Sequence, residues 1–298
     1  MHYTGIIYRP PFEADSLLLQ VTVGCSHNKC SFCYMYHDRP FSVCPLEQIA
    51  EDIEEASRTT PNVKRVFLEH GDAFVLNAER LEKIADLIHE KLPKVETISM
   101  YASILNIRNK TDEELLRLRE CGINELDIGV ESGFDTALTM MNKGYTNEES
   151  VTQLLRLKKA GMDFSLNVIL GCAGADLWKE NAEATADMLN RVQPHLLFIG
   201  TLHADKGCQL YYDMQNGIFK ECTYGQLLDE QELLIRKLEL NDTIYFGSHP
   251  SNVVPMEGYL PLHKEEMLDV IQKMRERLHD RLNTYPLRAG EGSILDRK

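Results

Sequence analysis

Three cysteines lie close together near the start of the chain. Cys25, Cys30 and Cys33 stand within the nine residues 25–33. A cube of four irons and four sulfides usually takes four thiolates. Three thiolates on one loop would leave one iron open to an exchangeable ligand, as in metal centres that do chemistry instead of bracing a fold. The spacing therefore predicts a reactive iron–sulfur centre.

Other uses of these thiols stay open at this point. Cys44 or His37 could complete a structural zinc site with them. Eight cysteines in 298 residues are too few for a disulfide scaffold, and in a reducing compartment clustered thiols more often hold metal. A zinc site needs no glycine-rich or acidic motif elsewhere in the chain, so such motifs separate the two interpretations.

Short aliphatic or β-branched runs alternate with longer amphipathic runs from residue 16 to about residue 203, which predicts repeated βα units around a parallel sheet. Thr111 and Thr146 begin capping-box patterns, and Gly122 and Gly161 stand where helices should end. The expected strands are Leu17–Val23, Val63–Leu68, Thr97–Tyr101, Glu125–Val130, Ser165–Leu170 and Leu196–Thr201.

Six βα units are fewer than a closed eight-stranded barrel needs, so the expected fold is α/β, a partial (β/α)6 TIM-like barrel. We expect an N-terminal segment at residues 1–15, the barrel at 16–204 and a C-terminal extension at 205–298 that covers the barrel. In the extension, 205–224 is expected to be a loop, 227–240 a helix, 241–261 irregular and 264–282 an amphipathic helix.

Small motifs follow several of the expected strands. The cysteine loop follows the first strand and His70-Gly71-Asp72 the second, while Glu131 opens a motif after the fourth strand and Gly171 a motif after the fifth. The C-terminal ends of parallel strands form the active face of such a barrel. We therefore expect these motifs to meet at one rim.

The charge of the chain limits its partners. Lys and Arg total 32 against 46 Asp and Glu, a formal net charge of −14, which disfavours broad binding to nucleic acid or to an anionic membrane. The first twenty residues contain Glu13 and Asp15 and no long apolar run, so neither a secretion signal nor a membrane span is expected. The predicted location is the cytoplasm.

The cysteine loop resembles that of the radical S-adenosylmethionine (SAM) superfamily. Those enzymes use Cys-x3-Cys-x2-Cys after the first strand of a six-unit partial barrel, with an aromatic residue just before the last cysteine. Cys30-Ser-Phe32-Cys33 matches the second half, whereas Cys25 stands one residue further away, which makes a Cys-x4-Cys-x2-Cys variant. The resemblance implies that the three cysteines hold a [4Fe–4S] cluster and that SAM occupies the open iron.

The same resemblance implies an activity. An electron from the reduced cluster would cleave SAM to a 5′-deoxyadenosyl radical, which removes hydrogen from a small-molecule or peptide substrate. A flavodoxin- or ferredoxin-type protein would supply the electron, and the enzyme would be sensitive to oxygen.

Cofactor-binding residues are carried over from the resemblance motif by motif. Gly71 and Asp72 would receive the SAM amino group, Glu131 would face SAM, and Lys143 would pair with the SAM carboxylate, although a solvated surface lysine is the alternative. The remaining SAM contacts are assigned to the fifth-strand motif, to aromatic residues and to the third strand end: Asn167, Ile169, Phe32, Tyr34 and Ser103.

Candidates on the substrate side come from strand ends and from the extension. Tyr101, His203 and Cys172 are the proposed catalytic residues, Cys172 as a possible hydrogen-atom donor. Further candidates, for which a structural role is the alternative, are His70, Asp205, Cys208, His249 and Asn252. Four cysteines could hold a second cluster, although buried thiols are the usual explanation for such irregular spacing: Cys121, Cys172, Cys208 and Cys222.

A narrower resemblance concerns a bacterial group of stand-alone radical SAM proteins without a settled reaction. This resemblance rests on the segments 67–73, 207–211, 248–252 and 258–261. We expect neither a cobalamin domain before the barrel nor an RNA-binding module after it. The competing class is a metal-binding, electron-transfer or redox-sensing protein that keeps the barrel without SAM turnover.

Overall fold

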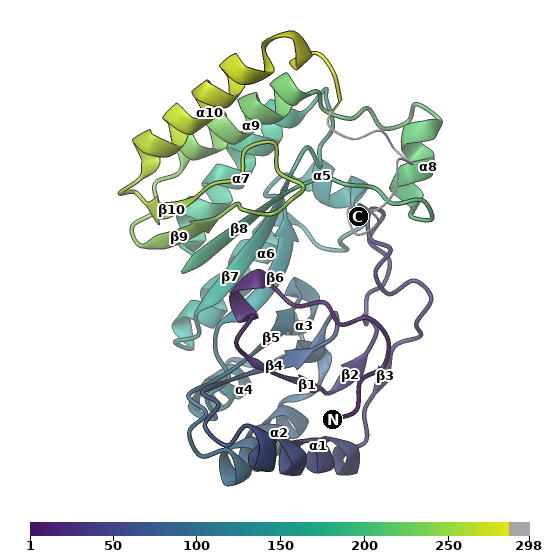
Figure 1. Cartoon of the computed structure of the whole chain (residues 1–298), viewed down its shortest axis with the longest axis vertical. Coiled ribbons are helices and arrows are strands. Elements are labelled where there is room, and N and C mark those ends of the chain that lie inside the picture. Colours follow the sequence, from purple (N-terminus) through teal and green to yellow (C-terminus); the bar gives the residue numbers. More distant parts are fainter. Residues whose placement is uncertain (286–298) are drawn as a thin grey trace. The chain divides into compact units, whose positions relative to one another are not determined.

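An eight-stranded sheet organises the chain. The computed structural model describes residues 1–285, and its strands follow the order β1-β4-β5-β6-β7-β8-β9-β10 (Figure 1). Pairing is parallel for β1-β4, β4-β5, β5-β6, β7-β8 and β8-β9, and antiparallel for β9-β10. The bounds are β1 Leu17–Gln20, β4 Arg65–Glu69, β5 Thr97–Ala102, β6 Leu126–Glu131, β7 Phe164–Leu170, β8 Leu196–Thr201, β9 Thr243–Phe246 and β10 Glu257–Leu260.

The expected α/β class with a parallel sheet is confirmed, and the architecture is consistent with a partial TIM-like barrel. All six expected strands are present within a few residues of their predicted bounds. The first one is divided, however. After β1, a separate β2 (Thr22–Val23) pairs antiparallel with β3 (Ser42–Val43), so a two-residue ladder closes the loop that carries the cysteines.

The chain forms two compact units. The first comprises 1–28, 36–128 and 152–164, and the second comprises 29–35, 129–151 and the chain from 165 onward. In the first unit α1 (Leu46–Thr59) packs beside α2 (Ala78–Lys91), and α2 contacts α4 (Asp112–Glu120) (Figure 1). Two short helices, α3 (Ile104–Arg108) and the 3-10 turn η2 (Ala73–Val75), follow strand ends.

A buried ion pair lies inside the first unit. Glu13, at the end of the 3-10 turn η1 (Pro11–Glu13), is 1% exposed and accepts hydrogen bonds from Arg65 (2.8 Å) and from the Ser99 hydroxyl (2.8 Å). Buried charges of this kind require a partner and further hydrogen bonds. The contacts tie the N-terminal segment to β4 and β5.

Helix ends follow the sequence signals. Thr111 and Glu114 form a complete capping box at α4, and Thr146 exchanges the same two bonds with Glu149 at α6 (Asn147–Lys159). Gly122, with φ of 81°, follows α4 in the left-handed conformation that only glycine adopts without cost.

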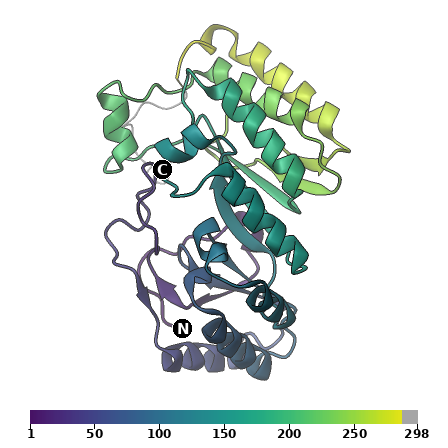
Figure 2. The ribbon, with the colours of Figure 1, turned by 180° about the vertical axis from the view of Figure 1, so that it is seen from behind.

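In the second unit, three long helices pack together. Figures 1 and 2 show α7 (Trp178–Val192), α9 (Tyr224–Lys237) and α10 (Lys264–Leu278) side by side, with α9 in contact with both of the others. A capping box of Thr223 and Gln226 starts α9 three residues earlier than expected. The predicted final helix ends at Leu278 and is followed by the 3-10 turn η3 (His279–Arg281).

Two expectations for the extension are wrong. Residues 205–224 contain the helix α8 (Gln209–Gln215), and 241–261 contain β9 and β10 instead of irregular chain. The strands are four residues long, and β9 pairs with the distant β8, a contact that local sequence does not reveal. The domain boundaries at 15 and 204 stay predictions, and residues 286–298 of the extension lie outside the described part. Among the helices of residues 1–285, none has the length and apolarity needed to cross a bilayer.

Candidate active site

The first cysteine lies against the motif that follows β4. The Gly71 amide donates to the Gly24 carbonyl oxygen (3.2 Å), and the Gly24 amide donates to Nδ1 of His70 (3.4 Å). A Cβ atom at Gly71 would lie 3.0 Å from Cβ of Cys25 and 2.6 Å from the Tyr36 ring. Only glycine permits this approach, so Gly71 sets the packing of the backbone against Cys25.

Asp72 is buried and anchored on the same side. It is 1% exposed, and its Oδ2 accepts hydrogen bonds from the Ser26 hydroxyl (2.6 Å) and from the side-chain amide of Asn106. Asn106 lies on α3. The Ser103 hydroxyl caps this helix by accepting a hydrogen bond from the backbone amide of Asn106. Asp72 therefore joins the cysteine loop to the end of β5.

One residue between the first two cysteines has an unusual backbone conformation. Asn28 has φ of 42°, the left-handed region that asparagine tolerates better than most residues. Its side-chain amide donates to the Tyr36 carbonyl oxygen (3.0 Å). This hydrogen bond joins the residues that come directly before and after the segment 29–35 in the chain.

The second and third cysteines belong to a turn of the second unit. The Cys33 amide donates to the Cys30 carbonyl oxygen (3.2 Å). Ser31 bonds through its amide to Met141 O (3.1 Å) and through its hydroxyl to Met140 O (2.7 Å), and its own carbonyl accepts the Leu210 amide (2.8 Å). These bonds fasten the turn to the helix α5 (Asp135–Met140) and to α8.

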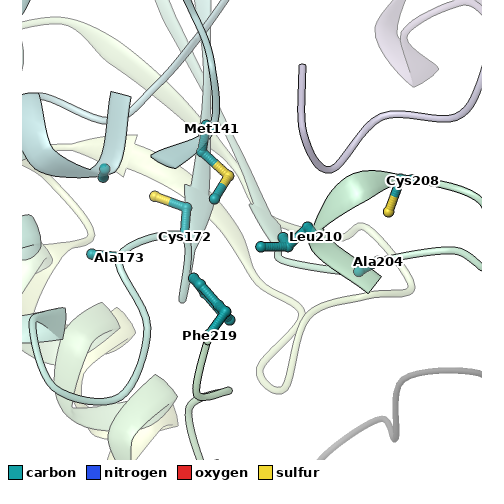
Figure 3. Packing of buried hydrophobic residues seen from close by; sticks show 8 residues of the cluster. Met141, Cys172, Ala173, Ala204, Cys208, Leu210 and Phe219 are labelled. Atoms are coloured by element: carbon teal, nitrogen blue, oxygen red, sulfur yellow. The ribbon is translucent and has the colours of Figure 1, made fainter. Parts of the chain in front are cut away.

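An apolar cluster of the second unit packs against this turn (Figure 3). Phe32 of the turn contacts the cluster, as do Ile169 and Leu202. The buried members are Ala137, Met141, Cys172, Ala173, Ala204, Cys208, Leu210 and Phe219. Tyr34 is 38% exposed, and its ring lies against Gly207, where an added Cβ would stand 2.3 Å from Cε2.

Glu131 and Lys143 form a buried ion pair. Their side chains are each 10% exposed and the Nζ to Oε1 distance is 2.9 Å. Burial by itself would lower the pKa of Lys143, but the charge of Glu131 raises that pKa well above its usual value. The alternative of a solvated surface lysine is therefore wrong.

Left-handed residues end three strands. His70 (φ 75°) follows β4, Glu131 (φ 64°) closes β6, and Gly171 (φ 81°) follows β7. Glutamate seldom adopts this conformation, which costs of order 1–3 kcal/mol, and such strain gathers at functional sites. All three residues belong to motifs that the sequence singled out.

A polar network lies behind the end of β7, in the second unit. Glu230 on α9 accepts the Gly171 amide (2.7 Å) and the side-chain amide of Asn181 on α7 (2.6 Å). Asn181 Oδ1 accepts the Ser132 hydroxyl, and the Cys172 thiol lies 3.8 Å from the same oxygen and from the Glu131 carbonyl. The network connects the residues after β6 to those after β7.

Sequence reasoning missed Glu230 and Asn181. Burial raises the pKa of Glu230 to about 7, against the lowering effect of the two amides that it accepts. A signal was available: Glu230 stands three residues after Leu227 and four before Leu234, on the apolar face of its helix. A carboxylate at such a position needs an internal partner.

Glu69 was also missed. It ends β4 and is fully buried, and among residues 1–285 neither of its carboxylate oxygens has a hydrogen-bond partner. Burial, with a smaller contribution from the charge of Asp52, raises the pKa of Glu69 to about 7. Glu69 is therefore protonated in part at neutral pH.

The other predicted site residues are distributed between the units. Tyr101 and Ser103 lie in the first unit at the end of β5, where Tyr101 contacts Phe67 edge-on (5.2 Å between ring centres) and burial raises its pKa well above the usual value. Asn167 and His203 are half-buried residues of the second unit, and His203 Nε2 lies 3.0 Å from Asp205.

For several candidate residues the structure favours the alternative of a structural role. Burial raises the pKa of the Cys172, Cys208 and Cys222 thiols, as expected for protonated core cysteines. His249 bonds to Ser251 (2.7 Å), and Asn252 bonds to backbone carbonyls of Ile199 and Gly247 (2.7 Å each), which favours structural roles for both.

No three His, Cys, Asp or Glu side chains among residues 1–285 form a ready-made metal site. The ligand sets inferred from the sequence, with Cys25, Cys30 and Cys33 as the principal one, accordingly stay predictions. Within the first unit Cys25 lies against Gly71, and within the second unit the charge of Cys30 contributes to the raised pKa of Lys143.

Comparison with known proteins is consistent with this description. The family model for the radical SAM superfamily matches residues 19–182. The heme chaperone HemW of Bacillus subtilis is 25% identical over 223 residues, which cover 72% of this chain and 58% of that protein. A tRNA-2-methylthio-N(6)-dimethylallyladenosine synthase of Nitrosomonas europaea is 28% identical over 191 residues, 60% of this chain and 42% of that protein.

Among solved structures, that of a methylornithine synthase has the same fold, with a TM-score of 0.52 and 18% identity over 92% of this chain and 83% of that one. The chain spans about half the length of the two curated relatives.

Proposed function

Because the chain belongs to the radical SAM superfamily, we propose that it holds a [4Fe–4S] cluster on Cys25, Cys30 and Cys33 and cleaves SAM reductively. The observation that carries the proposal is the family match over residues 19–182, a segment that includes all three cysteines and the motifs after β4, β6 and β7. The superfamily's cofactors are this cluster and SAM.

The donor set suits such a cluster. The three thiols are half-buried, so they are sheltered from solvent yet accessible to a ligand. The negative charge of a Cys30 thiolate is among the charges that raise the pKa of Lys143. A positive charge therefore lies within electrostatic reach of Cys30.

The residues at the strand ends would bind and orient SAM. Glu131 and Lys143 present one charge of each sign, which suits the amino and carboxylate groups of the methionine part. Ile169 and Phe32, which both pack on the apolar cluster, would hold the adenine. Asn167 is assigned to the ribose, and Gly71, Asp72, Tyr34 and Ser103 complete the proposed set.

The bound cofactors would supply the difficult chemistry: one electron from the reduced cluster splits SAM into methionine and a 5′-deoxyadenosyl radical, which takes a hydrogen atom from the substrate. This chain's residues would hold the two partners close together and exclude water. Tyr101, His203 and Cys172 are the proposed residues on the substrate side. Cys172 is fully buried and hydrogen-bonded, so a donor role for it requires an opening of the loop after β7.

A small molecule or a peptide is the proposed substrate, and a flavodoxin- or ferredoxin-type protein the proposed reductant. The relatives' names concern a heme chaperone and a tRNA-modifying synthase. The net charge of −14 favours the smaller substrates over nucleic acid. The cytoplasm stays the predicted compartment.

Reconstitution without oxygen tests the proposal. Wild-type protein should bind about four irons per chain and should release 5′-deoxyadenosine from SAM when reduced with dithionite. Cys25→Ala, Cys30→Ala and Cys33→Ala should each abolish both results. The matched control is Cys121→Ala, which removes a half-buried thiol outside the motif and should leave both unchanged.

Two outcomes would contradict the proposal. Tightly bound zinc without iron would support a structural metal site. A stable cluster that leaves SAM intact under reducing conditions would support the electron-transfer or redox-sensing class instead.

A further inference from the structure

Two tripeptides of the first unit contact each other residue by residue. Gly24-Cys25-Ser26 of the cysteine loop lies against His70-Gly71-Asp72 after β4. The Gly24 amide donates to the His70 ring (3.4 Å), the Cys25 side chain lies against Gly71, and the Ser26 hydroxyl donates to Asp72 (2.6 Å). The motif after β4 therefore already has protein partners on the cysteine side.

Of these three contacts, only the Ser26–Asp72 contact is a hydrogen bond between two side chains. Ser26 is exposed, whereas Asp72 is 1% exposed and receives a second bond from Asn106 on α3. Further along the same turn, the Lys110 ammonium donates to the carbonyl oxygens of Phe74 (2.6 Å) and Leu76 (2.9 Å). The bond from Asn106 thus holds the buried Asp72 carboxylate in place, and this carboxylate in turn holds the exposed Ser26 hydroxyl.

We propose that Asp72 is a positioning residue, which holds Cys25 in place for the cluster by accepting the hydroxyl of Ser26. The inference rests on the proposed function for the identity of the cluster, but the restraint on Cys25 belongs to the protein without cofactors. This role toward Cys25 is additional to the contact with SAM that is proposed for Asp72 above.

The physical reason lies in the geometry of the loop. Cys25 is half-buried and has an exposed neighbour on its C-terminal side. A hydrogen bond to a carboxylate is worth about a tenfold change in an opening equilibrium. Without it, the residue after Cys25 is free to move with solvent, and the thiol samples orientations that do not suit ligation.

Thiol labelling of the protein without cofactors tests the restraint alone. In oxygen-free buffer, Ser26→Ala should raise the rate of N-ethylmaleimide labelling at Cys25 by up to about tenfold relative to Cys30 and Cys33. Lys29 lies between Cys25 and Cys30, so trypsin places them on different peptides for mass spectrometry. The matched control is Ser57→Ala, which removes an exposed hydroxyl bonded to the Glu54 carbonyl on α1 and should leave the ratio unchanged.

A double-mutant cycle on the reconstituted protein tests the role toward the cluster. Ser26→Ala and Asp72→Ala should each speed iron loss to a chelator, and the double variant should lose iron no faster than Asp72→Ala alone, because Asp72→Ala already removes the hydrogen bond to Ser26. The SAM concentration for half-maximal binding should change little in Ser26→Ala.

The outcomes separate this inference from the proposed function. If the wild type holds no iron–sulfur cluster, the proposed function fails, whereas the labelling result still decides the restraint on Cys25. Equal labelling of Ser26→Ala and wild type would overturn the inference, even if SAM is cleaved. So would an Asp72→Ala variant that keeps its iron and loses only SAM binding.

Discussion

At the scale of single residues, the Glu131–Lys143 pair is the most informative contact of the second unit. Both side chains are nearly buried, and Glu131 also carries a left-handed backbone. A buried pair contributes little net stability compared with apolar residues, but removing one partner leaves an uncompensated charge. Such an arrangement is costly to maintain for stability alone, which agrees with a binding role.

We expect Lys143→Met to lower the free energy of unfolding by about 3–5 kcal/mol, because it strands the Glu131 carboxylate. Urea unfolding of the protein without cofactors measures the change. The matched control is Lys220→Met, which breaks an ion pair with Asp176 whose side chains are 67% and 71% exposed, and which should cost less than about 1 kcal/mol. Equal losses in the two variants would contradict the buried pair.

At the scale of elements, α9 reaches the end of β7 through one carboxylate. Glu230 holds the Gly171 amide and the Asn181 side chain together, so the loop after β7 depends on a helix more than fifty residues later in the chain. The pKa of Glu230 is raised to about 7 in the folded state. The folded protein therefore keeps this proton to a higher pH than the unfolded chain does.

The contribution of Glu230 to the free energy of unfolding should consequently fall as the pH rises from about 4.5 to about 7. Above about pH 7 this contribution should no longer change with pH. Glu230→Gln removes the titration, so the stability of the variant relative to wild type should rise by up to about 3 kcal/mol between pH 5 and pH 8. Glu69 titrates in the same range in both proteins and cancels in the difference. Urea unfolding across this pH range is the measurement.

Glu183→Gln on α7 is the matched control, since its carboxylate is 45% exposed and pairs only loosely with Lys237 (3.5 Å). Its difference from wild type should stay within about 0.5 kcal/mol over the whole range. A Glu230→Gln difference that is equally flat would show that the carboxylate is not buried in the way described.

At the scale of the whole molecule, charge limits the choice of partner. The chain carries a formal charge of −14, and non-specific binding to nucleic acid depends on neutralising phosphates with lysine and arginine. One curated relative is a tRNA-modifying synthase, but the chain spans only 42% of its length. The net charge therefore disfavours broad, non-specific binding to nucleic acid.

We expect a fluorescent single-stranded RNA to show no binding at micromolar protein in about 150 mM salt. Ordinary non-specific binders have dissociation constants of about 10⁻⁴–10⁻⁶ M, and the affinity of this protein should be weaker than that range. Fluorescence anisotropy at two salt concentrations makes the measurement, with a basic RNA-binding protein as the positive control. Submicromolar affinity that weakens steeply with salt would contradict the prediction and indicate a basic patch.

Much of the fold could be predicted because its signals are local. The period of apolar residues indicated the six strands, and Thr111 and Thr146 marked helix starts through side chains three residues away. The strands β9 and β10 escaped because each has four residues and depends on a distant pairing partner. In the same way, the sequence does not reveal that Lys143 is buried, because its ion pair with Glu131 forms only in the folded chain.

The amino-acid sequence by itself determined the strand periodicity of this protein and predicted its ligand chemistry, because residue type, spacing and alternation are properties of neighbouring positions. Only the tertiary structure decided what each motif contacts: Asp72 bonded to Ser26, Lys143 paired with Glu131, and Glu230 placed behind Gly171. The physical reason is that burial and hydrogen-bond partners arise from residues far apart in the chain, which come together only when the sheet and its helices pack.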